Sequence, residues 1–315
     1  MKIITFEDMK KFNISNLEAY SWVEEMLLHK DEAYLPPKIS MKYPTKPGVF
    51  YNVMPSIIPH ENVAGVKLVS RYPDASPALN SLLILCDFED GTPLAFMDAN
   101  YITAMRTGAV AVHSVKLFAN KDFETIGLIG LGNVMRATMK IFADVFPHRN
   151  FQIKLYKYKD SHISFMEEFK DNPNFHFEIA DTYEDVVRDS DVVMSAATYF
   201  DHDICSDDCF KKGVTVLPIH TRGFANCDLF FDKVFADDVG HVRGFKYFNK
   251  FKNFAEVHEV VCGKKPGRTD RDERILVYNI GISLHDIYYA SKIYKKYCTK
   301  LPDSDMKAPT EKYWY

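Results

Sequence analysis

The feature of this sequence that most constrains its fold is a regular alternation of short apolar runs and helix-like stretches between about residues 120 and 285. The apolar runs are TIGLIGLG, FQIKLYKY, NFHFEIA, DVVMSAA, VTVLPI and KVFADD. Strands that alternate with helices at this spacing predict a parallel sheet with helices on both faces. We therefore expect an α/β fold in which residues 116–285 form a doubly wound domain.

The first part of the chain has a different pattern. A helix is expected over residues 6–30, with Pro36-Pro37 ending it, and further helices are expected over 101–119 and 281–297. Between them lie the strand-like runs GVFYNVMP, GVKLVS, SLLILCDF and PLAFMDA, and FEDGTP is expected to form a hairpin turn. These elements predict a split α+β domain formed by residues 1–115 and 286–315.

Composition narrows the classes of partner. Charged residues make up 26% of the 315 residues, and the formal net charge is −4 with the two signs interspersed. This mixture offers neither a basic footprint for nucleic acid nor a polybasic segment for a membrane. No apolar run approaches the roughly 20 residues of a spanning helix, and the residues MKIITFEDMKKF are not expected to act as a signal peptide. A cytoplasmic protein without nucleic-acid or membrane partners is expected.

The six cysteines are scattered over the chain. Cys205 and Cys209 form a pair, but no second pair of ligands stands nearby at the spacing of a zinc site. We therefore expect reduced thiols and no metal centre.

A glycine-rich turn, Gly130-Leu131-Gly132-Asn133-Val134, lies between a predicted strand and a predicted helix. In a Rossmann loop the first glycine permits a tight turn, and the second lets the backbone approach a pyrophosphate at the helix N-terminus. Met135 replaces the third glycine of that fingerprint, which predicts looser packing of helix on strand. We expect Gly130, Gly132, Asn133 and Val134 to bind a dinucleotide, with an ordinary strand–helix turn as the alternative.

The end of the next predicted strand bears on the type of dinucleotide. NAD sites usually carry an acid there, but this chain has Lys157, Tyr158 and Lys159 before its first acid, Asp160. A cation at this position welcomes a 2′-phosphate. The pattern favours NADP(H), with NAD(H) possible, and the alternative is two solvated lysines.

Basic residues mark two other regions. Lys67 lies between apolar neighbours in AGVKLVSRYP, and Arg106-Thr107 opens a helix rich in small residues. Lys38 follows the two prolines, and the buried strand VTVLPI ends in His220 and Arg222. The functional interpretation places these residues at a site for an acidic substrate. The alternative is a solvent-facing lysine, a capping arginine and a polar loop.

The chain resembles the ornithine cyclodeaminase/mu-crystallin family. The resemblance rests on YNVMP, GVKLVSRYP, DANYITAMRTGAVAVHSVKLFA, IGLIGLGNVMRATMK, DVVMSAAT and GRTDRDERILVYNIGISLHDIYYA, which follow the family's order. It implies a substrate domain that also forms a homodimer and a Rossmann domain for NAD or NADP. It further implies that Lys67 acts at the reacting carbon, that Arg106 holds the substrate carboxylate with help near Lys38, and that Met54 lines the pocket. Thr107, Ala197 and Thr198 are assigned to the cofactor.

The departures from the family pattern matter as much. The cyclodeaminases carry a glutamate where this chain has Asn52, here assigned to the substrate. Aligned through Leu229, the family's catalytic aspartate falls on Arg222. The loop after VTVLPI is expected to line the site because ligands bind at the carboxyl ends of the strands. The acid that handles the amine in a cyclodeaminase is therefore missing.

The chemistry that remains is cationic. Arg106 and Arg222 suit a substrate with carboxylates, His220 can exchange a proton near neutral pH, and burial can lower the pKa of Lys67. We expect an NAD(P)H-dependent oxidoreductase of an imine derived from a 2-oxo acid, or of the corresponding amino acid. This covers ketimine reduction, opine-type dehydrogenation and amino-acid dehydrogenation. Two alternatives stay open: an ammonia lyase that uses NAD catalytically, and an NADP-binding protein with little catalysis.

Overall fold

The computed structural model describes residues 1–197, 200, 202–219, 229–304 and 311–312. It divides into two compact units: residues 1–15, 29–106 and 282–315 form the first, and residues 16–28 and 107–281 the second. The sequence predicts boundaries at 115/116 and 285/286. The structure differs, because residues 16–28 and 107–115 belong to the second unit and residues 282–285 belong to the first.

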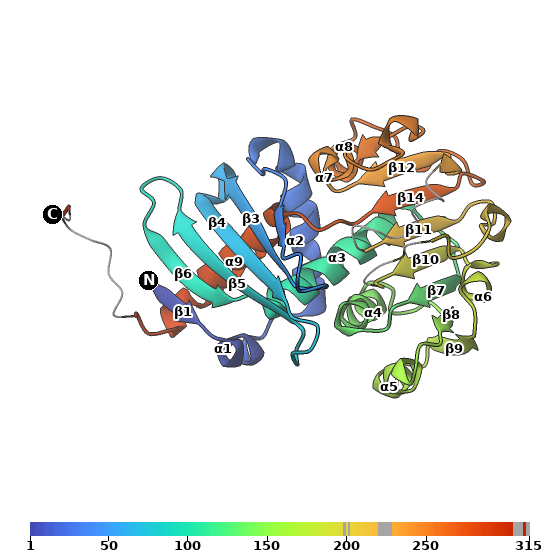
Figure 1. Cartoon of the computed structure of the whole chain (residues 1–315), viewed down its shortest axis with the longest axis horizontal. Coiled ribbons are helices and arrows are strands. Elements are labelled where there is room, and N and C mark those ends of the chain that lie inside the picture. The colour runs from blue at the N-terminus through green and yellow to red at the C-terminus, as the bar shows by residue number, and fades with distance from the viewer. Residues whose placement is uncertain (198–199, 201, 220–228, 305–310, 313–315) are drawn as a thin grey trace. The chain divides into compact units, whose positions relative to one another are not determined.

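The first unit is built on a six-stranded sheet with the order β1-β6-β5-β4-β3-β2 (Figure 1). Its strands are β1 (Lys2–Ile4), β2 (Ile39–Lys42), β3 (Phe50–Ile58), β4 (Val63–Arg71), β5 (Leu79–Asp87) and β6 (Pro93–Asp98). Neighbouring strands are antiparallel except for β1 and β6. The predicted FEDGTP hairpin joins β5 to β6, and Gly91 there has a φ of 76°.

One helix covers one face of this sheet. The helix α9 (Ser283–Tyr297) contacts β3, β4 and β5, and it is drawn in red across the sheet in Figure 1. Along each of these strands the buried residues alternate with partly exposed ones, as expected for a sheet with one covered face. The face toward α9 is therefore the core of the first unit. The short helices are α1 (Phe6–Lys11), η1 (Lys30–Glu32), η2 (Pro59–Glu61) and η6 (Cys298–Lys300).

The second unit is a parallel sheet with the order β13-β12-β14-β11-β10-β7-β8-β9. Its strands are β7 (Thr125–Ile129), β8 (Phe151–Tyr156), β9 (Phe175–Ala180), β10 (Val192–Ser195), β11 (Thr215–Pro218), β12 (Lys233–Ala236), β13 (Ala255–Glu256) and β14 (Ile275–Tyr278). All its strand pairs are parallel. The doubly wound α/β fold expected from the alternation is confirmed.

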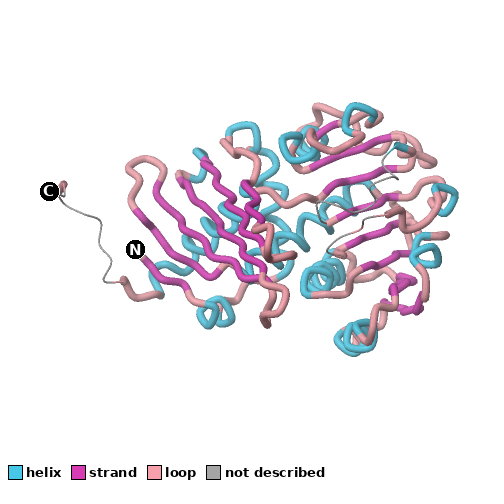
Figure 2. Tube along the Cα trace, viewed as in Figure 1, coloured by secondary structure: helices cyan, strands magenta, loops and turns pink. Residues whose placement is uncertain are grey.

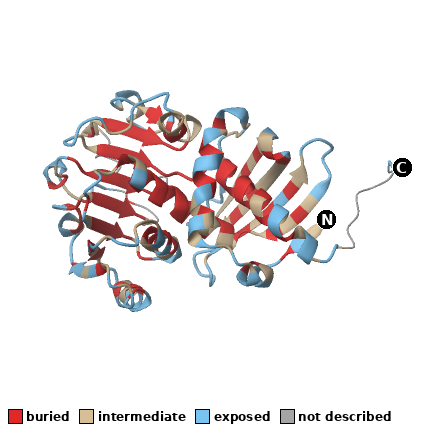
Figure 3. Ribbon diagram, turned by 180° about the vertical axis from the view of Figure 1, so that it is seen from behind, coloured by how far each residue is buried: buried red, intermediate tan, exposed pale blue. Residues whose placement is uncertain are grey.

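Helices pack on this parallel sheet, as the secondary-structure colouring of Figure 2 shows. They are α2 (Asn16–Leu28), the part of α3 (Asn100–Phe118) from Thr107 onward, α4 (Asn133–Val145), α5 (Ser161–Glu168), α6 (Tyr183–Val187), α7 (Val239–Val242), α8 (Val257–Val261), η3 (Asp207–Cys209) and η5 (Phe248–Lys250). The strands β10, β11, β12 and β14 are buried at every position, which Figure 3 shows in red. Such strands read as continuous apolar runs because both faces are covered.

The strand order reverses between β7 and β10. From β7 the chain proceeds outward through β8 and β9, and it then returns to place β10 on the other side of β7. In doubly wound sheets, ligands bind at the carboxyl ends of the strands at this switch point.

None of the helices formed by the described residues combines the length and apolar character that crossing a membrane requires.

Candidate functional site

A fully buried lysine lies at the centre of the first unit. Lys67 is in the middle of β4, where the register pairs it with Met54 on β3 and Leu83 on β5. Directly paired residues of antiparallel strands point to the same face, so Lys67 and Met54 share the face covered by α9. The exposed fraction of Lys67 is 0%. The sequence predicted a site residue here, against the alternative of a solvent-facing lysine, and the structure excludes that alternative.

Asp286, in the first turn of α9, pairs with this lysine. Its Oδ1 accepts a hydrogen bond from Lys67 Nζ at 2.6 Å and a second from Arg106 Nε at 2.9 Å. Both Lys67 and Asp286 have side chains with 0% exposure, and that of Arg106 is 7% exposed. Thr103 Oγ1 accepts a longer hydrogen bond of 3.4 Å from Lys67 Nζ. The result is a buried group of two cations that share one carboxylate oxygen.

The charge of Lys67 is opposed by its surroundings. Its pKa is lowered to about 7, and burial is the largest cause. The Asp286 carboxylate acts in the opposite direction, and the positive charges of Arg106 and Lys38 add to the lowering. A lysine with such a pKa changes its charge near neutral pH. It can therefore donate or accept a proton under the conditions in which an ordinary lysine stays charged.

Local packing brings α9 close to the sheet. Ser283 Oγ at the start of α9 donates a hydrogen bond of 2.6 Å to the carbonyl oxygen of Pro55 on β3. Gly65 lies two residues before Lys67, and a Cβ there would stand 2.6 Å from the Ile84 carbonyl oxygen and 2.7 Å from Ile287 Cδ1. Only glycine gives Ile287 of α9 this access to β4, so Gly65 helps to hold Asp286 at its distance from Lys67.

The other predicted substrate residues lie in the same unit. Asn52 is two residues before Met54 on β3, and its Oδ1 is buried without a hydrogen-bond partner among the described residues. Lys38 precedes β2, is partly buried and acts on the pKa of Lys67. The structure thus brings Lys67 and Arg106 together through Asp286, with Met54 and Lys38 beside Lys67.

The predicted cofactor loop lies at the switch point of the second unit. Gly130 follows β7 with a φ of 82°, and a Cβ on it would stand 2.6 Å from backbone atoms of Ala196 and Ala197, which follow β10. Gly132 differs, because among the described residues no atom beyond the adjacent backbone lies within 4 Å of the Cβ it would carry. It is the N-cap of α4, and no side chain caps that helix end. The loop fits a pyrophosphate: Gly130 closes the turn, and Gly132 leaves the helix N-terminus open.

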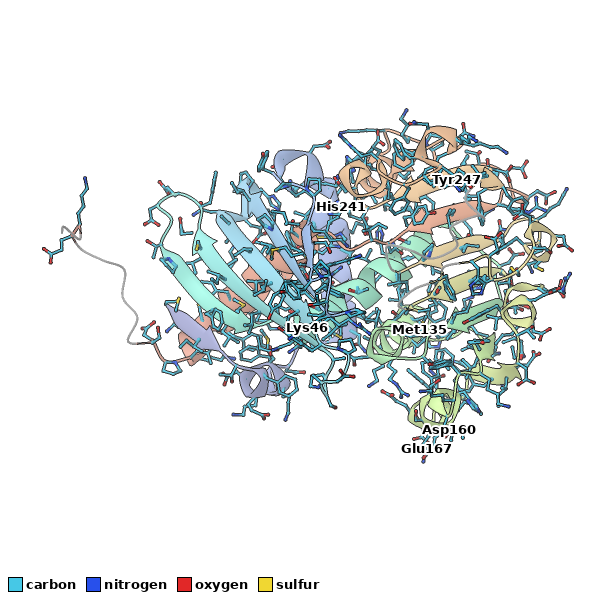
Figure 4. The ribbon with its side chains drawn as sticks, viewed as in Figure 1. Lys46, Met135, Asp160, Glu167, His241 and Tyr247 are labelled. Carbon is cyan, nitrogen blue, oxygen red and sulfur yellow. The ribbon has the colours of Figure 1, made fainter. Side chains whose placement is uncertain are left out.

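Met135, at the third position of the fingerprint, is fully buried on α4, where Figure 4 labels it. The close helix contact lies elsewhere, since a Cβ on Gly108 of α3 would stand 2.8 Å from Thr138 N on α4. Thr107 is buried beside Gly108. Thr198, His220 and Arg222 lie outside the described residues.

The basic residues after β8 are exposed. The side chain of Lys157 is 52% exposed and lies 3.3 Å from Asp181, and Tyr158 is 60% exposed. Lys159 has a φ of 50°, and its Nζ lies 5.5 Å from the centre of the Tyr158 ring. Asp160, labelled in Figure 4, is the N-cap residue of α5. The site therefore offers two accessible cations, one of them shared with an acid.

His29, Glu32 and His60 place ligand atoms within 4.8 Å of one another. Their rings do not favour a metal ion, because His29 and His60 stack with centroids 4.2 Å apart and planes at 23°. Stacked imidazoles do not direct their in-plane nitrogen lone pairs to one point. We assign no metal to this group.

Asp286 is the site residue that sequence reasoning missed. It stands 219 residues after Lys67, inside a helix whose first turns are buried. The available signal was a lone acid in the mostly apolar run ISLHDIYYA, since an acid that is fully buried needs a partner.

Comparison with known proteins gives the chain's relatives. The model of the ornithine cyclodeaminase/mu-crystallin family matches residues 2–300. The nodulation efficiency protein NfeD of Rhizobium meliloti is 27% identical over 270 residues, which cover 82% of this chain and 83% of that protein. N-((2S)-2-amino-2-carboxyethyl)-L-glutamate dehydrogenase of Staphylococcus aureus is 26% identical, with 77% of each chain covered. A Delta(1)-pyrroline-2-carboxylate reductase of Bacillus cereus is 25% identical, with 78% and 80% covered.

Solved structures share the fold. The Delta(1)-pyrroline-2-carboxylate reductase of Thermococcus litoralis, in complex with NADH and L-proline, has a TM-score of 0.83 at 22% identity over 95% of this chain and 98% of that one. An archaeal alanine dehydrogenase dimer with bound NAD has a TM-score of 0.83 at 24% identity over 98% and 99%.

The two glycines of the loop yield a prediction. Gly132→Ala is expected to fold normally, because its Cβ meets no described atom beyond the adjacent backbone. It is expected to weaken NAD(P)H binding by about tenfold or more, since the methyl group would occupy the space proposed for the ligand. Gly130→Ala is expected to lower the melting temperature, because it strains a positive φ and contacts the Ala196–Ala197 backbone. Fluorescence titration with NADPH and thermal unfolding measure the two effects. Unchanged affinity in a folded Gly132→Ala variant would contradict the assignment.

Proposed function

This chain belongs to the ornithine cyclodeaminase/mu-crystallin family, and on that premise we propose that it is an NAD(P)H-dependent oxidoreductase acting at a carbon–nitrogen bond. Its substrate is the imine of a 2-oxo acid in one direction and the corresponding amino acid in the other. The observation that carries the proposal is the buried Lys67, whose ammonium is paired with Asp286 next to Arg106. Two relatives support it by name, a Delta(1)-pyrroline-2-carboxylate reductase and a ketimine reductase mu-crystallin.

Arg106 is suited to hold the substrate carboxylate. Its Nε is engaged by Asp286, and no described residue accepts a hydrogen bond from its two terminal nitrogens. A guanidinium is permanently charged and binds a carboxylate through two parallel N–H groups. When Lys67 is protonated, Lys67 and Arg106 carry two positive charges, and Asp286 neutralises one of them. One positive charge therefore remains to bind one carboxylate of the substrate.

Lys67 is suited to exchange the proton. An imine accepts a hydride readily when its nitrogen is protonated, and the amine that forms must keep that proton. The nicotinamide, when bound, supplies the hydride or accepts it in the reverse direction. The buried Nζ of Lys67 carries a proton that it can release near pH 7. Arg106 binds the substrate carboxylate and so orients the carbon–nitrogen bond. Gly130, Gly132 and the start of α4 would hold the pyrophosphate.

The reaction class is tested by a substrate panel. 2-oxo acids are incubated with NADPH, with and without ammonia or an amino acid, and the preformed cyclic imines of 2-oxo acids are added separately. The proposal predicts net NADPH consumption that requires an imine. A lyase that regenerates its cofactor releases ammonia from a diamino acid without net consumption. A protein that binds NADPH and turns over none of these substrates would be a binder.

The pH dependence gives a second test. Imine reduction requires the charged form of Lys67, so kcat/KM is expected to fall as the pH rises through about 7. The reverse oxidation requires the neutral form and is expected to rise through the same range. The Lys67→Met variant is expected to lose this pH dependence of kcat/KM and to react about 10²–10⁴-fold more slowly. A folded Lys67→Met variant that keeps the same pH profile would exclude this role.

We propose NADP(H) as the preferred cofactor, because Lys157 and Lys159 stand where an NAD site usually has an acid. Lys157→Asp is expected to reverse the preference, since a lost charged contact is worth about 1–3 kcal/mol. Lys170→Asp is a matched control, because Lys170 is also exposed and also pairs with an acid, Glu167, but it follows α5 and does not stand at the end of β8. Titration calorimetry with NADPH and NADH measures both. Equal wild-type affinities would contradict the preference.

We propose that the chain forms a homodimer through the outer face of the six-stranded sheet. The register places one apolar residue of each of five strands in a row across that face: Ile3, Phe96, Ile84, Val66 and Pro55. Ile3 is 48% exposed and Ile84 is 41% exposed. A continuous exposed apolar patch marks an interaction surface. A second copy is the occupant we favour, since a solved neighbour of the same fold is a dimer.

Ile84→Lys is expected to break this dimer, because it places a charge in the middle of the apolar row. Leu79→Lys is the control: Leu79 is on the same strand, is 45% exposed, and by strand alternation faces the other side. Light scattering should give about twice the chain mass of 36.3 kDa for the wild type and the control, and one chain mass for Ile84→Lys. A wild-type monomer at micromolar concentration would refute the interface.

A further inference from the structure

We propose that Asp286 is the positioning residue of this site, which holds Lys67 and Arg106 in place through one oxygen and keeps Lys67 able to carry a proton at neutral pH. The inference rests on the proposed role of Lys67. It adds to that proposal a carboxylate from α9. In the sequence, Arg222 stands at the position that aligns with the catalytic aspartate of the family.

The first argument is the way in which Asp286 divides its two oxygens. Oδ1 accepts hydrogen bonds from both Lys67 and Arg106, whereas Oδ2 is buried and has no partner among the described residues. A buried carboxylate placed for stability alone is expected to satisfy both oxygens. The one-sided arrangement instead concentrates the negative charge between the two cations.

Glu61 shows what a structural carboxylate looks like in the same unit. It is also buried and also pairs with α9, but both of its oxygens are engaged: Oε1 lies 3.3 Å from Lys292 Nζ, and Oε2 accepts hydrogen bonds from Lys295 and Ser291. Glu61 therefore fastens α9 to the turn before β4. Asp286 leaves one oxygen unpaired and contacts the two predicted site cations instead.

The second argument is the charge balance around Lys67. Among the described residues, the charged groups that act on it are Asp286 from α9, Arg106 from α3 and Lys38 before β2. Arg106 cannot lose its proton in a protein. Without Asp286, deprotonation of Lys67 would remove both the repulsion between the two cations and the free-energy cost of burying the lysine's charge. Asp286 is therefore the group that prevents Lys67 from becoming permanently neutral. Because Lys67 and Arg106 both donate to the same oxygen, Oδ1, Asp286 also fixes the distance between the lysine and the arginine.

The test measures the charge of Lys67 directly, so that it does not depend on any substrate. The chain is labelled with ¹³Cε-lysine, the Lys67 signal is assigned by its absence in Lys67→Met, and the signal is followed against pH. Asp286→Asn is expected to lower the Lys67 midpoint by about one pH unit or more, because it removes the attracting charge. The fraction of charged Lys67 at pH 7 then falls by about fivefold, and kcat/KM for imine reduction falls at least as much.

Two further variants keep the test decisive. Asp286→Asn leaves two buried cations unopposed and can fail to fold, so the same change is made in the Arg106→Gln background, where the lost charges balance. The double variant should titrate about one pH unit below Arg106→Gln. Asp286→Glu keeps the charge but moves it by one methylene, so it should keep the midpoint and lower kcat.

Glu61→Gln is the matched control. It should lower the melting temperature and leave the Lys67 midpoint and the pH profile of kcat/KM unchanged. A Lys67 midpoint that is the same with and without the Asp286 charge would overturn the inference, whether or not the chain reduces imines. A shifted midpoint without imine reduction would leave the inference standing and reject the proposed function.

Discussion

The burial of the Lys67 ammonium is the constraint on which the first unit depends. Taking a charge out of water costs several kcal/mol unless a partner compensates it, and here the compensation comes from Asp286 on the last long helix. The sheet carrying Lys67 and the helix carrying Asp286 come from opposite ends of the chain. The unit is therefore complete only when the C-terminal segment packs on the N-terminal sheet. Gly65 and Ser283 serve this contact by letting α9 lie close to β4 and β3.

The second unit depends on a different local constraint, the reversal of strand order between β7 and β10. The backbone after β10 comes so close to Gly130 that no side chain fits there. This crowding explains the first glycine of the loop without any ligand. The second glycine has no such reason among the described residues, because none of them lies near the Cβ it would carry. The contrast separates a glycine that the fold requires from one for which the proposed pyrophosphate contact supplies the reason.

Much of the fold could be predicted from local patterns. The runs SLLILCDF and PLAFMDA are β5 and β6, and the predicted helix over 101–119 is α3. Other features depend on distant contacts. The predicted helix over 6–30 is two helices, and α2 belongs to the second unit because it packs on α4 and α8. The short run ILVY is β14, which lies between β11 and β12, and nothing in its own sequence states its neighbours.

The candidate site shows the same division at the level of single residues. Lys67 and Arg106 were found because they stand in recognisable local motifs. Asp286 was not, because its meaning depends on a contact across 219 residues. An acid is nevertheless expected once Lys67 and Arg106 are both placed in a buried site. Without a neighbouring anion, Lys67 would lose its proton or its side chain would turn toward solvent. A lone acid in an apolar helix that packs on the lysine's strand is the natural candidate, and Asp286 is the acid that the structure places there.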